Sequence, residues 1–86
     1  LQIDFVVPND ETTYDPVQHI SFDNPINTEV DYIQANVYSE SGVLLDSYLS
    51  ASPERIEFNF STSTAAYIII EDANQTAFVI DNLTFY

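Results

Sequence analysis

Oxygen-bearing side chains provide most of the chemistry available to this chain. It contains fourteen Asp and Glu residues and one His, but no cysteine. Such a set suits Ca²⁺, which takes oxygen ligands from carboxylates, amides and backbone carbonyls. No EF-hand loop pattern occurs, so a calcium site would have to be assembled from separate segments. We expect such a site at Asp81 and Asn82, joined by Asp4 if the first strand lies beside the last.

Catalysis is not expected from these side chains. General acid–base chemistry needs groups in complementary protonation states within a cleft, and the alternation around His19 directs its ring away from the apolar side of its strand. There is no nucleophile-elbow, zincin or phosphate-loop motif, and Gly42 is the single glycine. We therefore predict a non-enzymatic protein that requires no cofactor, with Ca²⁺ as the ion that it is best suited to hold.

Tyrosines offer a second kind of chemistry, because aromatic faces stack on the apolar faces of sugar rings. The chain has six tyrosines, and three of them could share the outer face of one predicted hairpin: Tyr32, Tyr38 and Tyr48. Tyrosine is also a common residue of half-buried strands. The pattern therefore fits internal packing as well as a carbohydrate-stacking platform.

Three N-x-S/T sequences make N-glycosylation a further possibility, at Asn59, Asn74 and Asn82. The motif is used only where the asparagine is exposed and the protein passes through a glycosylating secretory pathway. Asn74 is the first choice because it lies in a predicted turn, and Asn59 follows because its side chain is predicted to face outward.

Strands must position all of these residues. Val, Ile, Thr, Tyr and Phe dominate the chain, and no helical stripe of useful length occurs. The predicted strands are residues 2–7, 18–23, 29–39, 43–49, 55–60, 65–70 and 76–86. Their number and spacing indicate an antiparallel β-sandwich of about seven strands, jelly-roll or immunoglobulin-like, in a single domain over residues 1–86.

The last predicted strand contains an irregularity. Phe78 and Ile80 occupy even positions, whereas Leu83 and Phe85 occupy odd ones, and alternate residues of a regular strand face opposite sides. A β-bulge or bend at residues 81–82 would let both halves of the strand face the core.

The first predicted strand stands apart from the others, because a polar linker over residues 8–17 follows it. Residues 1–7 either pack in their own sandwich or detach and complete the sheet of a neighbouring chain. In such donor-strand exchange Ile3, Phe5 and Val7 would enter the neighbour's groove.

Charge narrows the range of partners. The net charge is −13, with one arginine and no lysine, so phosphate backbones and anionic lipid surfaces should repel the chain. No apolar run is long enough to cross a bilayer. We therefore expect neither nucleic-acid binding nor membrane insertion, and the partners that remain are copies of the chain itself or a surface polysaccharide.

Two stretches, HISFDNPINTEVDYIQANVYSESGVLLDS and AFVIDNLTFY, resemble bacterial or archaeal secreted and surface jelly-roll modules of the galactose-binding-like and carbohydrate-binding kind. Those modules often close with an I-D-N-apolar-x-F strand. The resemblance implies a secreted or cell-surface location. It also implies that an aspartate of the last strand, Asp81, joins an acidic residue of the first strand, Asp4, around calcium.

Together these observations predict a non-enzymatic extracellular structural or adhesive protein. The leading hypothesis is a subunit of a surface filament or array that assembles by donor-strand exchange. The alternatives are a carbohydrate-binding accessory module and a calcium-stabilised spacer of a larger surface protein.

Overall fold

The computed structural model describes residues 1–25, 32–72 and 80–86. Within these ranges the secondary structure consists of nine strands and no helix, so no helix there could cross a membrane. The strands are β1 (Gln2–Asp4), β2 (Val6–Val7), β3 (Asp10–Tyr14), β4 (His19–Asn24), β5 (Ile33–Tyr38), β6 (Leu44–Ser50), β7 (Glu54–Asn59), β8 (Tyr67–Asp72) and β9 (Asp81–Phe85). The all-β prediction is confirmed.

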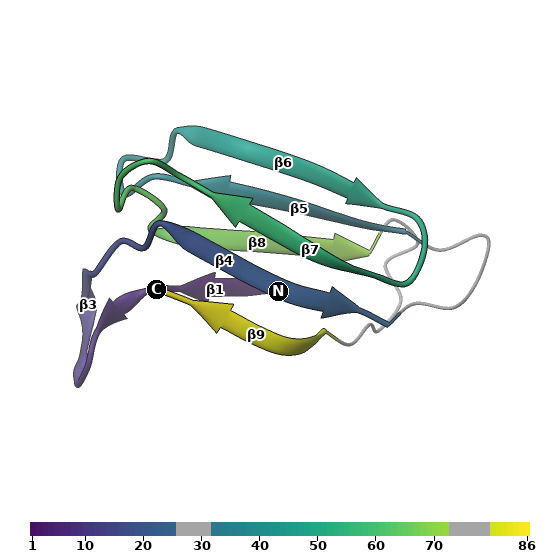
Figure 1. The fold of residues 1–86 in the computed structure, drawn as a ribbon. Helices are drawn as coiled ribbons and strands as arrows, with labels where there is room; N and C mark the ends of the chain where they lie inside the picture. The colour runs from purple at the N-terminus through teal and green to yellow at the C-terminus, as the bar shows by residue number, and fades with distance from the viewer. Residues whose placement is uncertain (26–31, 73–79) are drawn as a thin grey trace.

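Two antiparallel sheets pack face to face (Figure 1). The four-stranded sheet has the order β1-β8-β5-β6, and the three-stranded sheet has the order β7-β4-β9. The turn between β6 and β7 carries the chain from one sheet to the other. A small hairpin of β2 and β3 belongs to neither sheet, and Figure 1 shows it projecting from one end of the sandwich.

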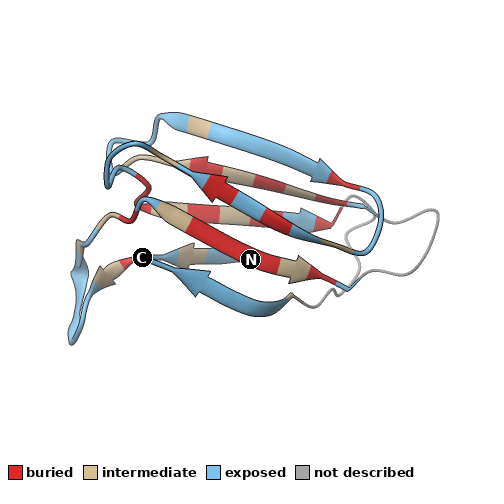
Figure 2. Cartoon of the chain, viewed as in Figure 1, coloured by how far each residue is buried: buried red, intermediate tan, exposed pale blue. Residues whose placement is uncertain are grey.

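Strict alternation of apolar and polar residues builds the core. In β5, Ile33, Ala35 and Val37 are fully buried, whereas the residues between them are only half-buried. Figure 2 shows the same alternation as bands of buried residues along the facing strands. The remaining core side chains come from β4, β7, β8 and the segments next to them: Phe5, Val17, Ile20, Phe22, Ile56, Phe58, Ala65, Ile68 and Ile70.

The first strand pairs with β8 of its own chain, with Gln2 opposite Ile69 and Asp4 opposite Tyr67. The segment predicted as a polar linker is more regular than expected. Residues Asp10–Tyr14 form β3, which pairs with β2. We call the β2–β3 hairpin, residues 6–14, the hairpin arm.

The predicted irregularity of the last strand is confirmed as a β-bulge. Ser21 pairs with Thr84 and Asp23 pairs with Asp81, so two residues of β9 oppose the single residue between Ser21 and Asp23. Asn82 adopts a left-handed backbone conformation with φ of 53°, which asparagine tolerates better than most residues. The bulge was expected to turn both halves of the last strand toward the core, and this is only partly found.

Ile80 packs against the core, but Leu83 is 36% exposed and Phe85 is 49% exposed. The reason is that β9 forms the edge of its sheet, where the sandwich covers its side chains incompletely. Phe78 lies outside the described residues.

Candidate functional site

One edge of the four-stranded sheet is formed by β1, and the other by β6. The backbone nitrogen of Leu1 donates to the carbonyl oxygen of Ile70 at 3.0 Å, and the nitrogen of Ile70 donates to the carbonyl oxygen of Leu1 at 2.8 Å. Beyond Asp4 the ladder continues, with the Phe5 nitrogen 2.9 Å from the carbonyl oxygen of Ala66. Without β1 these backbone groups of β8 would form an unpaired sheet edge, which is a template for another strand.

The side chains predicted to enter a groove have different positions. Phe5 is 3% exposed, and its ring centroid lies 4.9 Å from that of Phe85 in β9. Ile3 packs at the margin of the core, whereas Val7 is 37% exposed. The chain leaves the sheet at Phe5, whose carbonyl oxygen accepts a hydrogen bond from the Asp15 nitrogen at 2.8 Å. Val7 therefore lies on the hairpin arm, away from the core.

The last strand lies on the same side of the sandwich as β1 (Figure 1), and the Phe5–Phe85 contact joins them. We call β1 and β9, with their flanking residues 1 and 86, the terminal edge. Several of its apolar side chains are exposed: Leu1, Leu83, Phe85 and Tyr86. Residues 1–5 and 81–86 contain two acidic side chains, Asp4 and Asp81, out of the fourteen in the chain. The terminal edge thus exposes apolar side chains, while its share of acidic residues, 2 in 11, is close to the 14 in 86 of the whole chain.

The hairpin arm connects β1 to β4 and is largely exposed to solvent. At its tip the Asp10 carboxylate accepts hydrogen bonds from the Thr12 hydroxyl at 2.7 Å and the Thr13 hydroxyl at 2.8 Å. These bonds lower the pKa of Asp10. An isolated two-stranded hairpin is at best marginally stable in water. The hairpin arm is therefore a connection of low stability between β1 and the rest of the sandwich.

A polar network lies on the outer face of the three-stranded sheet, next to the bulge. The Arg55 guanidinium donates to Asp23 Oδ1 at 3.0 Å and to Ser21 Oγ at 2.7 Å. Asn82 Nδ2 donates to Asp23 Oδ2 at 2.6 Å. The hydrogen bonds from Asn82 and Arg55 lower the pKa of Asp23. Both carboxylate oxygens of Asp23 are engaged, and Arg55 supplies the positive charge that a bound cation would otherwise provide.

The same network contains the single histidine. His19 Nε2 lies 3.1 Å from Ser21 Oγ, and His19 Nδ1 lies 2.7 Å from Asn59 Oδ1. The ring stacks on Tyr86 with a centroid distance of 4.6 Å. Ser21, His19 and the side-chain amide of Asn59 are thus linked by contacts in the order nucleophile, base and orienting group, as at the site of an activated nucleophile. Ser21 is 1% exposed, however, and its oxygen also accepts a hydrogen bond from Arg55, so the arrangement gives catalysis no support.

The residues expected to bind calcium are not gathered into one site. Asp4 precedes Phe5, which contacts Phe85 near the end of β9, whereas Asp81 begins that strand. Four residues of strand separate Asp81 from Phe85, or about 13 Å. Across residues 1–25, 32–72 and 80–86, no group of three or more histidine, aspartate or glutamate side chains is arranged to hold a metal ion.

Tyr38 belongs to a row of tyrosines on the outer face of the four-stranded sheet. Its ring centroid lies 5.1 Å from that of Tyr67, which lies 6.0 Å from that of Tyr14. Burial and the nearby Asp4 carboxylate raise the pKa of Tyr14. Because these rings stack on one another, they cover faces that a sugar would need. The row therefore functions first as packing between β3, β8 and β5.

The other two predicted stacking residues are not part of this row. Tyr48 lies opposite Ala35, a core residue, and its hydroxyl donates to Glu54 Oε1 at 2.6 Å, which raises the pKa of Tyr48. The register of β5 and β6 shifts between Val37 and Tyr38, so that one extra residue of β6 is accommodated there. This shift inverts the facing of later β6 side chains. Tyr48 consequently lies on the other face of the sheet from Tyr38. The third residue, Tyr32, is exposed just before β5 begins.

Two of the three predicted glycosylation residues can be located. Asn59 is exposed at the end of β7 and contacts His19, whereas Asn82 is exposed at the bulge and its amide nitrogen is engaged with Asp23. Asn74 lies outside the described residues. A glycan on Asn82 would thus have to be attached to a nitrogen that already serves the polar network.

Sequence reasoning did not single out Asp23, Arg55 or Ser21. A signal was present, because all three occupy outward positions of strands with clear alternation, and Arg55 is the only basic residue among many acids. A lone arginine in such a chain is expected to find a carboxylate partner.

Comparison of the chain with protein-family models, with curated proteins and with solved structures gives no match.

Proposed function

We propose that this protein is a non-enzymatic structural subunit of a secreted or cell-surface assembly, and that it joins copies of itself by exchanging its N-terminal strand. One observation carries the proposal: Phe5, the residue directly after β1, is a core side chain, yet the chain reaches β4 from there through an exposed hairpin arm. A second copy presents an identical edge of β8. Exchange therefore replaces each contact of β1 by the same contact between two chains.

The connecting segment is long enough for exchange. Residues 6–15, which precede the bridge between Val17 and Ala65, span up to about 33 Å when extended, which exceeds the two shorter dimensions of the molecule, 25 and 23 Å. Unfolding the hairpin arm removes the β2–β3 pairing and the hydrogen bond between Asp15 and Phe5. The arm is largely exposed, so the main packing lost on opening is the stacking of Tyr14 on Tyr67.

Charge opposes contact between copies, whereas the apolar side chains of the terminal edge favour it. Copies with a net charge of −13 repel one another, but Leu1, Leu83, Phe85 and Tyr86 are exposed at this edge. Salt reduces the repulsion, since the Debye length is about 8 Å at physiological ionic strength. Assembly should therefore increase with ionic strength.

A cysteine pair can report in which chain β1 lies. Leu1 and Ile70 exchange two backbone hydrogen bonds, so the adjacent pair, Gln2 and Ile69, is a pair without hydrogen bonds. Such pairs have Cα atoms about 4.5 Å apart, within the range that a disulfide spans. The chain has no cysteine of its own, so every bridge in the Gln2→Cys/Ile69→Cys variant is made by the introduced cysteines.

The variant is equilibrated under reducing conditions at several protein concentrations, then oxidised and separated on a non-reducing gel. Exchange predicts covalent dimers and longer species that increase with concentration. The control is Asn36→Cys/Ser47→Cys, in which the facing residues belong to one hairpin and should bridge within one chain. Bridges confined to single chains at every concentration in both variants would show that β1 is not exchanged.

A further inference from the structure

Three of the six tyrosines form the stacked row on the outer face of the four-stranded sheet. Tyr38 and Tyr67 are directly opposite each other in the β5–β8 ladder, with ring centroids 5.1 Å apart and ring planes inclined by 15°. Tyr14, from the hairpin arm, has its centroid 6.0 Å from that of Tyr67 at an angle of 27°. All three residues are half-buried, so each ring is held in place while part of it stays open to solvent.

The other three tyrosines have different surroundings. Tyr86 stacks on His19, Tyr48 donates a hydrogen bond to Glu54 Oε1, and Tyr32 is exposed before β5. Stacking of one tyrosine on another is therefore confined to the row, within the part of the chain that the structure describes. A phenol can lose one electron to an oxidant, and two neighbouring phenoxyl radicals couple through their ring carbons. The row is thus the place where two tyrosines of one chain can be joined.

Carboxylates beside the row assist the first step of such a reaction, in which a phenol loses an electron and a proton. Asp4 is opposite Tyr67 in the β1–β8 pair, and its carboxylate forms a hydrogen bond with the Tyr14 phenol. A carboxylate in this position can take up the proton as the electron leaves. Glu40 adds a second negative charge that acts on Tyr14, and negative charge favours removal of an electron. We therefore expect Tyr14 to be oxidised most readily within the row.

We propose that Tyr14 and Tyr67 are the site of an oxidative dityrosine cross-link, formed by a peroxidase with hydrogen peroxide. Each phenol loses one electron and one proton, and the two phenoxyl radicals form a carbon–carbon bond between ring positions ortho to their oxygens. The two ortho hydrogens then pass to the oxygens, so that both phenols are restored. Hydrogen peroxide accepts the two electrons and two protons and becomes two water molecules.

Tyr14, rather than Tyr38, is the partner of Tyr67 because dityrosine joins the edges of two rings, whereas stacking brings their faces together. One ring must therefore move. Tyr38 is on β5, which is paired with a strand on each side, but Tyr14 ends the hairpin arm, whose stability is low. The new bond fastens the hairpin arm to β8. It thereby opposes the strand exchange proposed above, and only this consequence rests on the proposed function.

Trypsin reveals the cross-link, because the chain has Arg55 as its single basic cleavage residue. Cleavage there separates Tyr14 and Tyr38 from Tyr67 and Tyr86. The full chain is treated in dilute solution with peroxidase and hydrogen peroxide, isolated as a monomer under denaturing conditions, and digested. We expect dityrosine fluorescence in the monomer and two tryptic fragments that remain joined. Their combined mass should be lower by two hydrogens than the sum of the separate fragments.

Substitutions by phenylalanine identify the partners, because they keep the aromatic packing but remove the phenol. Tyr14→Phe should abolish the joined fragments, whereas Tyr38→Phe and the control Tyr48→Phe should retain them. Amide hydrogen exchange over residues 6–14 should be slower in the cross-linked protein than in the identically treated Tyr14→Phe variant, because the bond holds the arm closed.

The cross-link proposal is overturned if the tryptic fragments separate after oxidation, or if Tyr14→Phe leaves them joined. It is also overturned if the hairpin arm exchanges its amide hydrogens equally fast with and without the bond. None of these results depends on strand exchange, which the cysteine pair at residues 2 and 69 tests separately.

Discussion

Replacing Phe5 by alanine tests how firmly β1 belongs to the folded core. Phe5 is 3% exposed, and its ring packs against Phe85 and the core between the two sheets. Truncating a buried phenylalanine removes its transfer free energy and leaves a cavity, at a cost of about 3 to 5 kcal/mol. We expect Phe5→Ala to lower the free energy of unfolding by this amount.

The expected loss is large for a domain of this size. Stabilities of about 0.05 to 0.15 kcal/mol per residue correspond to about 4 to 13 kcal/mol for 86 residues. Each kcal/mol shifts the melting temperature of such a domain by about 4 to 8 °C, so the shift should exceed about 12 °C. Urea unfolding of dilute, monomeric protein, followed by circular dichroism, measures the change as a lower midpoint at similar slope.

Val7→Ala is the matched control, because Val7 lies only two residues further along but is on the exposed hairpin arm. It should change the free energy of unfolding by no more than about 0.5 kcal/mol. The reasoning would be refuted if Phe5→Ala cost less than about 1 kcal/mol, or if the two substitutions had similar effects.

Three further predictions concern the bulge and the hairpin turn. Asn82→Ala should destabilise the protein by about 1 to 2 kcal/mol because a left-handed conformation disfavours alanine, and Asn82→Gly should lose less in the same urea assay. The folded-state pKa of Asp23 is lowered, so its stabilising effect is complete above the ordinary carboxyl pKa and is lost as pH falls through the lowered value. Unfolding free energies in acid should therefore fall less steeply for Asp23→Asn than for the parent. Gly42→Ala should lower the free energy of unfolding by about 1 kcal/mol, because alanine is strained at the φ of 85° that Gly42 adopts. The added Cβ would itself make only an ordinary contact, 3.6 Å from the Tyr67 hydroxyl. A thermal melt unchanged by this substitution would contradict that reasoning.

Much of the fold follows from local patterns. Alternation placed strands at residues 18–23, 55–60 and in 29–39, and the structure has β4, β7 and β5 there with the expected side chains inside. Alternation succeeds because burial separates the two faces of a strand, whatever its neighbours are. The change of parity around Asp81 likewise located the bulge, because an extra residue is the simplest way to restore the facing of a strand.

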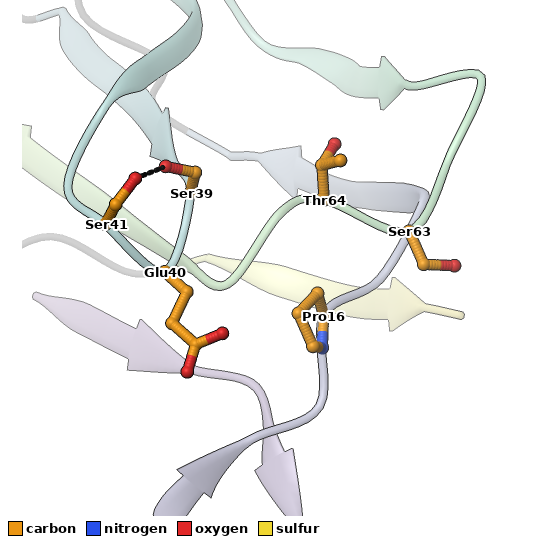
Figure 3. A pocket seen from close by; sticks show the side chains of 6 residues that line it. All are labelled: Pro16, Ser39, Glu40, Ser41, Ser63 and Thr64. Atoms are coloured by element: carbon orange, nitrogen blue, oxygen red, sulfur yellow. Dashed lines mark hydrogen bonds between the residues drawn. The ribbon is translucent and has the colours of Figure 1, made fainter.

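The candidate sites could be predicted only in part. Ile3, Phe5 and Val7 were expected to enter an apolar groove together, whereas in the structure Phe5 is buried, Ile3 is partly buried and Val7 is exposed. The chain bends at Phe5 to form the hairpin arm, and a bend that depends on the bond between Asp15 and Phe5 has no signature in alternation. The open hollow at one end of the sandwich (Figure 3) was not predicted at all, because three loops that lie far apart in the sequence line it: Pro16, Ser39, Glu40, Ser41, Ser63 and Thr64.

The sequence by itself determined which segments form strands and which side of most strands is buried, because both depend on neighbouring residues. Tertiary structure decided which strands are neighbours. In an immunoglobulin sandwich the first strand shares a sheet with the second strand and the last with the sixth, whereas here β1 pairs with β8 and β9 pairs with β4. That arrangement separates Asp4 from Asp81, and it joins Asp23 to Arg55 and Asn82. Backbone hydrogen bonds are alike for every strand, so partners are selected by how the whole set of apolar faces packs together, which no single segment encodes.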